Sequence, residues 1–195
     1  MDLNNLHEFM ELIGRLKVNI IHMKRTGWVH KKISDPETVA GHMYRMAMLS
    51  FLVDNKENLD KIKIMQMTLI HDLAECIVGD ITPYCGIPPD VKHRLEDEAM
   101  EEICKLLGDK GPMILEIFRE YEKQESAEAK YVKDLDRLDA IMQAYEYEKR
   151  DNIPGVLEEF FVACHGKIGH PFINKIVSEI TLRREALCRN LSTSK

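Results

Sequence analysis

The chain has 195 residues, of which 45% are hydrophobic, and this length and content suit one domain with a buried core. It has 27 basic and 33 acidic residues, so its net charge is −6 with the histidines neutral, and we expect no general affinity for nucleic acid. The apolar stretches are shorter than the roughly 20 residues of a membrane span. The polar start MDLNNLHEFM differs from a secretory signal, so we expect neither a membrane segment nor a signal peptide.

Helical periodicity begins at once, with apolar residues spaced three or four apart along one predicted helix face. These residues are Leu6, Phe9, Met10, Ile13, Leu16 and Ile20. A turn is expected at Thr26-Gly27-Trp28. A second helix is predicted to begin at Asp35 as N-cap, with Pro36 in the first helical position. Its inward face is predicted to comprise Val39, Met43, Met46, Ala47, Ser50 and Phe51.

A third helix is predicted from Asp60 to Gly79. Its inward face is predicted to comprise Ile62, Met65, Leu69, Leu73 and Ile77. Residues 80–89 contain three prolines and a glycine and should not form a helix interior.

The remaining chain continues the helical pattern without a clear strand signal. Helices are predicted over about 90–107, 112–124, 126–149, 156–164 and 171–188. These elements indicate a single all-α domain over residues 1–195, with a core at about 25–150 and C-terminal helices packing on it.

The five cysteines form an odd set without a CxxC pair, which disfavours both a disulfide framework and a thiolate zinc site. Reduced cysteines are typical of the cytoplasm, with the nucleus as the alternative compartment.

Two histidines and two carboxylates form a candidate metal site. His42, the pair His71-Asp72 and Asp136 belong to three predicted helices, and helices packed around an ion are a common way to build such a site. Imidazole and carboxylate suit Mn²⁺, Co²⁺, Zn²⁺ or Fe²⁺. Without an ion, the same residues would be ordinary core or surface groups.

Two observations favour the metal site. His42, His71 and Asp72 lie in apolar helical segments, where uncompensated polar groups are costly. Glu75 and Asp80 add two nearby carboxylates, which would repel each other without a cation.

Three segments together resemble a known family: ETVAGHMYRMA, LIHDLAECIVGDITP and VKDLDRLDAIMQAYEYE. They are similar to the HD-domain superfamily of metal-dependent phosphohydrolases, and most of all to its small YfbR-like 5′-deoxynucleotidases. The resemblance extends over nearly the whole chain, and HDxxE followed by GDxxP is more specific than the bare H…HD…D pattern.

The resemblance implies an all-α helical bundle with a divalent ion between core helices, and a homodimer. The ion would be Mn²⁺, Co²⁺ or Mg²⁺, with Zn²⁺ or Fe²⁺ as alternatives. The implied ligands are His42, His71, Asp72 and Asp136. The implied reaction hydrolyses deoxyribonucleoside 5′-monophosphates to deoxynucleoside and phosphate.

The resemblance also implies roles for two further carboxylates. Glu75 and Asp80 would be the catalytic residues, and Asp80 would also contact the substrate. In some members these two carboxylates and a backbone carbonyl, here that of Ile81, hold a second ion. Asp134 and Asp139, beside Asp136, are expected to be solvated or to support the site.

The substrate pocket departs from the bacterial pattern, in which an arginine directly precedes a tryptophan. Here Gly27 precedes Trp28, and the nearest arginine is Arg25. Trp28 is expected as a pocket wall and Arg25 as a phosphate contact. The alternatives are an HD phosphohydrolase acting on nucleoside triphosphates or cyclic nucleotides, and a non-catalytic nucleotide-binding or scaffold protein.

Overall fold

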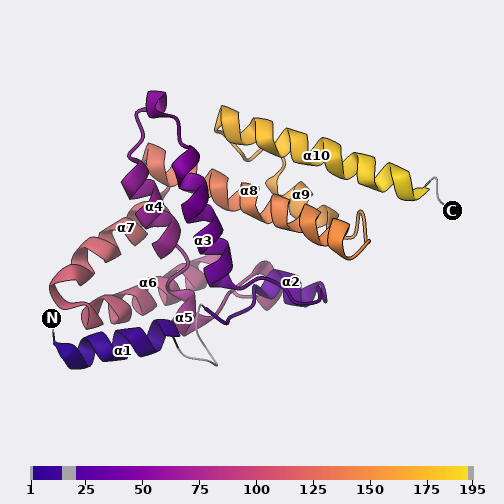
Figure 1. The fold of residues 1–195 in the computed structure, drawn as a ribbon. Helices are drawn as coiled ribbons and strands as arrows, with labels where there is room; N and C mark the ends of the chain where they lie inside the picture. The colour runs from indigo at the N-terminus through magenta and orange to yellow at the C-terminus, as the bar shows by residue number, and fades with distance from the viewer. Residues whose placement is uncertain (1, 15–20, 193–195) are drawn as a thin grey trace. The chain divides into compact units, whose positions relative to one another are not determined.

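The computed structural model describes residues 2–14 and 21–192, and it is helical, as the sequence predicts. The α-helices are α1 (Leu3–Gly14), α2 (Thr26–His30), α3 (Val39–Leu49), α4 (Lys61–Ile70), α5 (Glu75–Val78), α6 (Pro89–Leu106), α7 (Gly111–Lys123), α8 (Ala127–Arg150), α9 (Glu158–Cys164) and α10 (Pro171–Ser192) (Figure 1). Single 3₁₀ turns occur at Ser50–Leu52, Asn55–Glu57, Pro83–Cys85 and Gly108–Lys110. Within the described ranges, extended pairing is limited to one isolated bridge between Lys24 and Thr38. No helix in this part of the chain has both the length and the hydropathy needed to cross a membrane.

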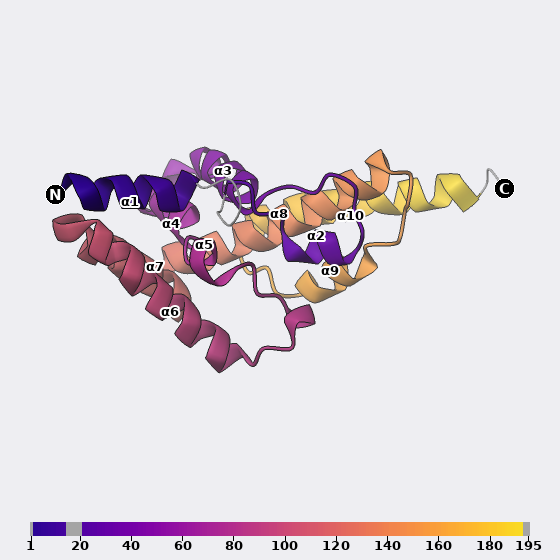
Figure 2. The same cartoon turned by 90° about the horizontal axis from the view of Figure 1, so that it is seen from below.

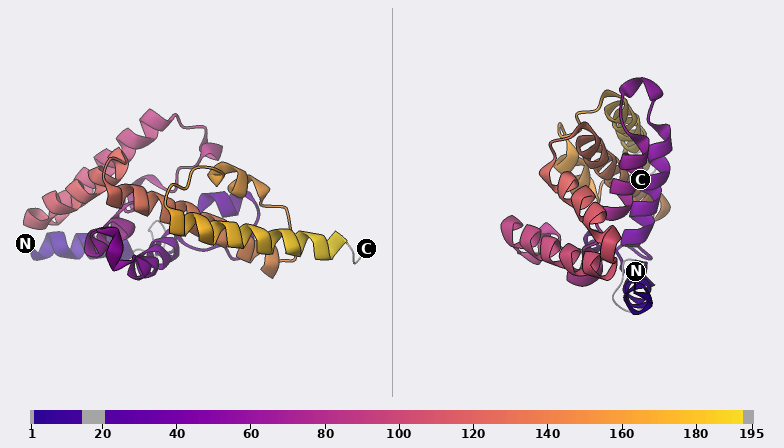
Figure 3. Two further views of the ribbon diagram at one scale, coloured as in Figure 1. Left: turned by 90° about the horizontal axis from the view of Figure 1, so that it is seen from above. Right: turned by 90° about the vertical axis from the view of Figure 1, so that its left-hand side faces the viewer.

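The chain divides into two compact units, Met1–Ala129 and Lys130–Lys195. In the first unit, α6 and α7 form a hairpin (Figure 2), and α3 and α4 lie side by side (Figure 3). Helix α7 also packs on α4, and α1 and α5 pack on α6. The core of this unit comprises Val39, Met43, Leu73, Ala74, Cys76, Ala99, Met100, Ile103, Cys104 and Phe118.

Helix α1 places Phe9 and Ile13 of its predicted face against this core, together with Leu12. Met10 is exposed, which corrects that part of the prediction. Leu16 and Ile20 lie outside the described residues.

In the second unit, Arg184 of α10 connects the three helices. Its guanidinium donates to both carboxylate oxygens of Glu148 on α8, at 2.7 and 3.0 Å, and pairs with Glu158 of α9. The same guanidinium stacks over the Phe161 ring, 4.0 Å from the centroid. Glu148 also accepts a hydrogen bond from the Leu157 amide at 2.8 Å, so this buried carboxylate is well satisfied.

Helix α3 begins at Val39 instead of near Asp35, contrary to the sequence prediction. Asp35 has a left-handed φ of 44° and therefore cannot lead directly into a right-handed helix. Thr38 is the N-cap, and its side chain accepts a hydrogen bond from the Gly41 amide at 3.0 Å. The predicted inward face is confirmed except for Phe51, which is exposed beyond the helix end.

The predicted helix over 60–79 is interrupted. Helix α4 begins after Asp60 as predicted but ends at Ile70, and α5 starts only at Glu75. Between them, backbone hydrogen bonds join residues three apart. The Glu75 amide, for example, donates to the Asp72 carbonyl at 3.1 Å. Residues three apart lie above one another in such a tight turn, which brings Asp72 and Glu75 to the same side.

The predicted inward face of this segment was also partly wrong. Ile62 and Leu69 are exposed, whereas Ile64 and Met67 are buried. Several apolar residues on α4 fit more than one face, and packing against α3 and α7 decides between them.

Candidate metal and phosphate site

His71 terminates α4 and has a defined tautomer. Its buried Nδ1 lies 2.9 Å from the Thr68 carbonyl oxygen, which can only accept a hydrogen bond. In the neutral ring Nδ1 is therefore protonated, and Nε2 keeps its lone pair. Nε2 is buried and has no hydrogen-bond partner among the described residues. A buried nitrogen lone pair oriented by a carbonyl is typical of a metal-ligating histidine.

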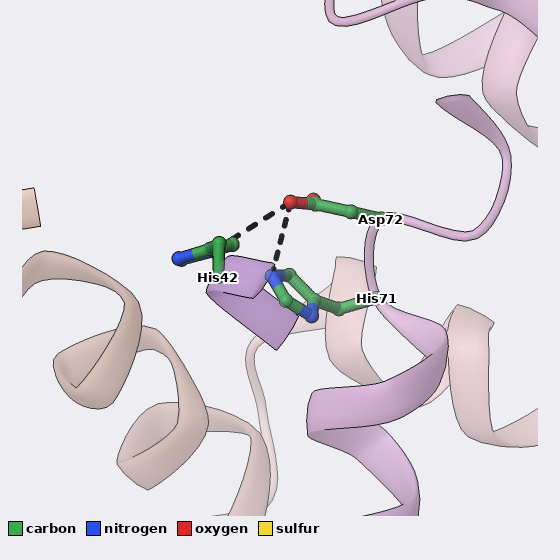
Figure 4. A group of neighbouring side chains, drawn as sticks. All are labelled: His42, His71 and Asp72. Carbon is green, nitrogen blue, oxygen red and sulfur yellow. Dashed lines mark ion pairs between the residues drawn. The ribbon is translucent and has the colours of Figure 1, made fainter. Parts of the chain in front are cut away.

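Asp72 lies close to both His71 Nε2 and His42 of α3. Its Oδ2 lies 3.3 Å from His71 Nε2 and 3.7 Å from His42 Nε2 (Figure 4). One ligand atom from each residue falls within 4.8 Å of the others. Ligand atoms about 2.0–2.2 Å from a common ion are separated by roughly 3 Å or more, so these three residues fit one divalent ion.

Asp72 is negatively charged in this setting. Burial alone would raise the pKa of its carboxyl, but the interactions with His71, His42 and Arg25 together outweigh burial and leave the pKa below its ordinary range. Arg25 Nη1 lies 3.3 Å from Oδ2. The fold thus places Arg25 in contact with Asp72 at the candidate site, and its contact with a phosphate stays a prediction.

Glu75 and Asp80 form an acidic cluster with Asp72. Glu75 is only 3% exposed, and its Oε2 has no hydrogen-bond partner in the described chain. Burial, followed by the charges of Asp72 and Asp80, raises the pKa of Glu75 well above its ordinary value. Asp80 follows Gly79, whose φ is 82°, and its Oδ2 accepts a hydrogen bond from the Thr26 amide at 2.7 Å. This bond connects the GDITP loop to the start of α2.

Trp28 lies in α2 and is 2% exposed. Its indole Nε1 donates to Glu37 Oε1 at 3.0 Å, and Arg45 donates to the other oxygen of that carboxylate at 3.0 Å. These bonds hold the ring in place. Contact between Trp28 and a substrate stays a prediction.

Asp136 belongs to the second unit, where its Oδ2 accepts a hydrogen bond from Lys133 Nζ at 2.9 Å. Its assignment as the fourth ligand stays a prediction. Of the two expectations for its neighbours, solvation was wrong, because Asp134 and Asp139 are both buried, and support of the site stays a prediction. Asp134 accepts hydrogen bonds from the amides of Gly169 and His170, each at 2.8 Å, so it shapes the chain before α10.

Lys92, in the first turn of α6, was not identified from the sequence. Burial lowers its pKa, but the charges of Glu96, Glu75, Asp72 and Asp80 outweigh burial and raise it. In the sequence, Lys92 is one charge in a highly charged helix, and nothing local distinguishes it.

The helical fold and a histidine–aspartate cluster beside additional carboxylates define a class of metal-dependent phosphohydrolases. Comparison with known families agrees: residues 13–175 match the HD domain family model. The chain belongs to the HD domain family.

Individual relatives are similar over most of their length. The chain is 46% identical to the 5′-deoxynucleotidase HDDC2 of Bos taurus, covering 93% of this chain and 87% of that protein. It is 37% identical to the 5′-deoxynucleotidase hdd1 of Schizosaccharomyces pombe, covering 96% and 94%. Among solved structures, a conserved hypothetical protein from Pyrococcus furiosus is 32% identical, with a TM-score of 0.64 and coverage of 90% and 98%. The PH0347 protein from Pyrococcus horikoshii is 26% identical, with a TM-score of 0.69 and coverage of 95% and 99%.

Proposed function

We propose that this protein is a metal-dependent 5′-deoxynucleotidase that hydrolyses deoxyribonucleoside 5′-monophosphates to deoxynucleoside and phosphate. The observation that carries the proposal is the convergence of His42, His71 and Asp72 in a chain 46% identical to a protein of that name. Glu75, which metal binding by these three does not require, lies beside them and supplies a group for chemistry.

His42, His71 and Asp72 would hold a divalent ion, with Asp136 as the fourth ligand. Mn²⁺, Co²⁺ or Mg²⁺ is proposed, with Zn²⁺ or Fe²⁺ as alternatives, because neutral imidazole and carboxylate accept all of these ions with different preference. When bound, the ion supplies positive charge that stabilises the phosphoryl oxygens. A second ion held by Glu75, Asp80 and the Ile81 carbonyl stays a prediction.

Glu75 would exchange a proton at Oε2. This oxygen is buried and has no hydrogen-bond partner in the described part of the chain, so no described residue uses its hydrogen-bonding capacity. A raised pKa brings a carboxyl closer to the operating pH of an acid–base catalyst. Glu75 would therefore orient and deprotonate the attacking water or protonate the leaving group.

Asp80, Arg25 and Trp28 would shape the nucleotide pocket. The Thr26 amide holds Asp80 through one carboxylate oxygen, which leaves the other to accept a hydrogen bond from the sugar 3′-hydroxyl. Arg25 would contact the phosphate, and Trp28 would support the wall that excludes a 2′-hydroxyl by crowding.

We further propose a homodimer, in accordance with the family resemblance, with a small nucleotide as its ligand and no nucleic-acid or membrane partner. The five cysteines form an odd set without a CxxC pair, and this pattern supports a reducing compartment, the cytoplasm or nucleus. Light scattering of the purified chain would test the dimer.

A substrate panel tests the proposed function. Phosphate release is measured from mono-, di- and triphosphates in ribo and deoxy forms and from cyclic nucleotides, each with added Mn²⁺, Co²⁺ or Mg²⁺. Asp72→Ala is the inactive control. Preferential hydrolysis of deoxynucleoside monophosphates is expected. Faster hydrolysis of triphosphates or cyclic nucleotides would assign a different HD phosphohydrolase, and nucleotide binding without turnover would indicate a binding protein.

A further inference from the structure

The packing of α6 on α5 brings the Lys92 ammonium group toward the acidic cluster of Asp72, Glu75 and Asp80. Lys92 occupies the first turn of α6, and α6 packs on α5, whose first residue is Glu75. The Lys92 Nζ lies 3.5 Å from Glu96 Oε1, one helical turn further on. The Lys92 side chain is 35% exposed, whereas Glu96 is buried, so the ammonium group has a fixed partner and remains accessible to a ligand.

The ammonium group is within electrostatic reach of the candidate catalytic residues. Glu75, Asp72 and Asp80 each favour its charged form. Lys92 therefore belongs to the electrostatic environment of the site although it is distant from it in sequence.

A phosphomonoester dianion must approach Asp72, Glu75 and Asp80, and like charges oppose that approach. Arg25 already contacts Asp72. Lys92 has three rotatable donors, and the contact with Glu96 uses at most one of them. An ammonium group with unused donors is a common phosphate ligand.

We propose that Lys92 binds the 5′-phosphate of the nucleotide and that Glu96 is its positioning residue. This inference rests on the proposed function, since it assigns the phosphate contact of that same site. It also assigns α6, which contributes no predicted metal ligand, a direct part in substrate recognition.

Lys92→Met tests the contact, because methionine keeps an unbranched apolar stem and removes the charge. The inhibition constant of inorganic phosphate should rise about 10- to 100-fold, the range typical of a lost hydrogen bond to a charged group. The kcat/KM for a deoxynucleoside monophosphate should fall by a similar factor. Inhibition by the deoxynucleoside and the bound metal content should not change. Lys92→Arg should restore part of the phosphate affinity.

Lys105→Met is the matched control, since Lys105 is the other lysine of α6 and is exposed near its far end. This variant should retain wild-type phosphate inhibition. Unchanged phosphate inhibition in Lys92→Met would overturn the proposal, as would an equal effect in Lys105→Met.

A double variant separates phosphate binding from a purely structural role. If Lys92 only neutralises the buried Glu96, then Lys92→Met combined with Glu96→Gln should restore both the melting temperature and the phosphate affinity. Under the proposal, the double variant regains stability but still binds phosphate weakly. Recovery of phosphate affinity would overturn the proposal.

Failure of the proposed function can be distinguished from failure of this inference. If wild-type protein releases no phosphate from any nucleotide, the proposed function fails. Calorimetric titration of the wild type and Lys92→Met with inorganic phosphate, at matched metal content, would still decide whether Lys92 binds phosphate. Equal affinity in that titration would overturn the inference.

Discussion

Glu75→Gln should change stability and catalysis in opposite directions. The wild-type carboxyl is buried beside Asp72 and Asp80, and these neighbours and burial raise its pKa well above its ordinary value of 4.5. Glutamine has nearly the same shape and carries no charge. In the metal-free protein, the substitution therefore removes a carboxyl group that must either bind a proton on folding or ionise where ionisation is costly.

The direction of the stability change follows from proton binding. Between the unfolded and folded pKa values of Glu75, the folded chain holds a proton that the unfolded chain has released. The free energy of unfolding of the metal-free wild type should therefore fall as the pH rises through this window. The Gln variant lacks this contribution. A relief of about 1 kcal/mol at neutral pH, the low end for a poorly satisfied buried group, corresponds to a Tm rise of about 2–4 °C.

Catalysis should decline in the same variant, because an amide cannot exchange a proton with the water or the leaving group. Loss of one acid–base group typically costs about 10²–10⁴-fold in rate, so kcat should fall by this factor while KM changes little. Glu75→Ala should show a similar loss of kcat while folding and retaining the first ion.

The assays are thermal melts in chelator across a pH series, phosphate release at saturating deoxynucleoside monophosphate, and metal analysis. Glu116→Gln, an exposed position on α7, is the control and should leave all three unchanged. Near-normal kcat in Glu75→Gln would refute the proposed acid–base role. A lower Tm in chelator would refute the electrostatic reasoning. Joint loss of metal and activity would place Glu75 among the metal ligands.

Three further outcomes are expected. Asp72→Ala should lose most bound metal. Because the ion stabilises only the folded state, chelation should lower the melting temperature of the wild type but not of this variant. Equal metal contents in the two proteins would contradict the proposed metal site. Thr38→Ala removes the cap on the Gly41 amide and should cost about 1 kcal/mol, or about 2–4 °C in Tm, in thermal melts. Glu148→Ala leaves the buried Arg184 charge without its main partner and should cost about 3–5 kcal/mol by urea denaturation, whereas a loss below 1 kcal/mol would contradict the role of this pair in the second unit.

Helices with strong local boundary signals were predicted closely from the sequence. Pro88-Pro89 and Gly108 bracket α6, Asp60 caps α4 through the amides of Ile62 and Lys63, and Ser126 accepts a hydrogen bond from the Ala129 amide at the start of α8. These signals act through bonds between residues a few positions apart, so the sequence contains them in full. The HDxxE and GDxxP spacing likewise identified the family and its candidate residues.

Residues with competing long-range partners could not be predicted in the same way. The Asp35-Pro36-Glu37 segment resembles a helix start, but Glu37 bonds to Trp28 and Arg45, and α3 begins only after Thr38. These tertiary contacts together outweigh a capping preference of about 1 kcal/mol.

The environment of the site also depends on packing. Sequence spacing identified His71, Asp72 and Glu75 as candidates, but the break after Ile70 determines how their side chains converge. Lys92 becomes a neighbour of that cluster only because α6 packs on α5. Burial and the electrostatic fields of residues distant in the sequence set the charge states of the site residues. Neither is a property of a local sequence window.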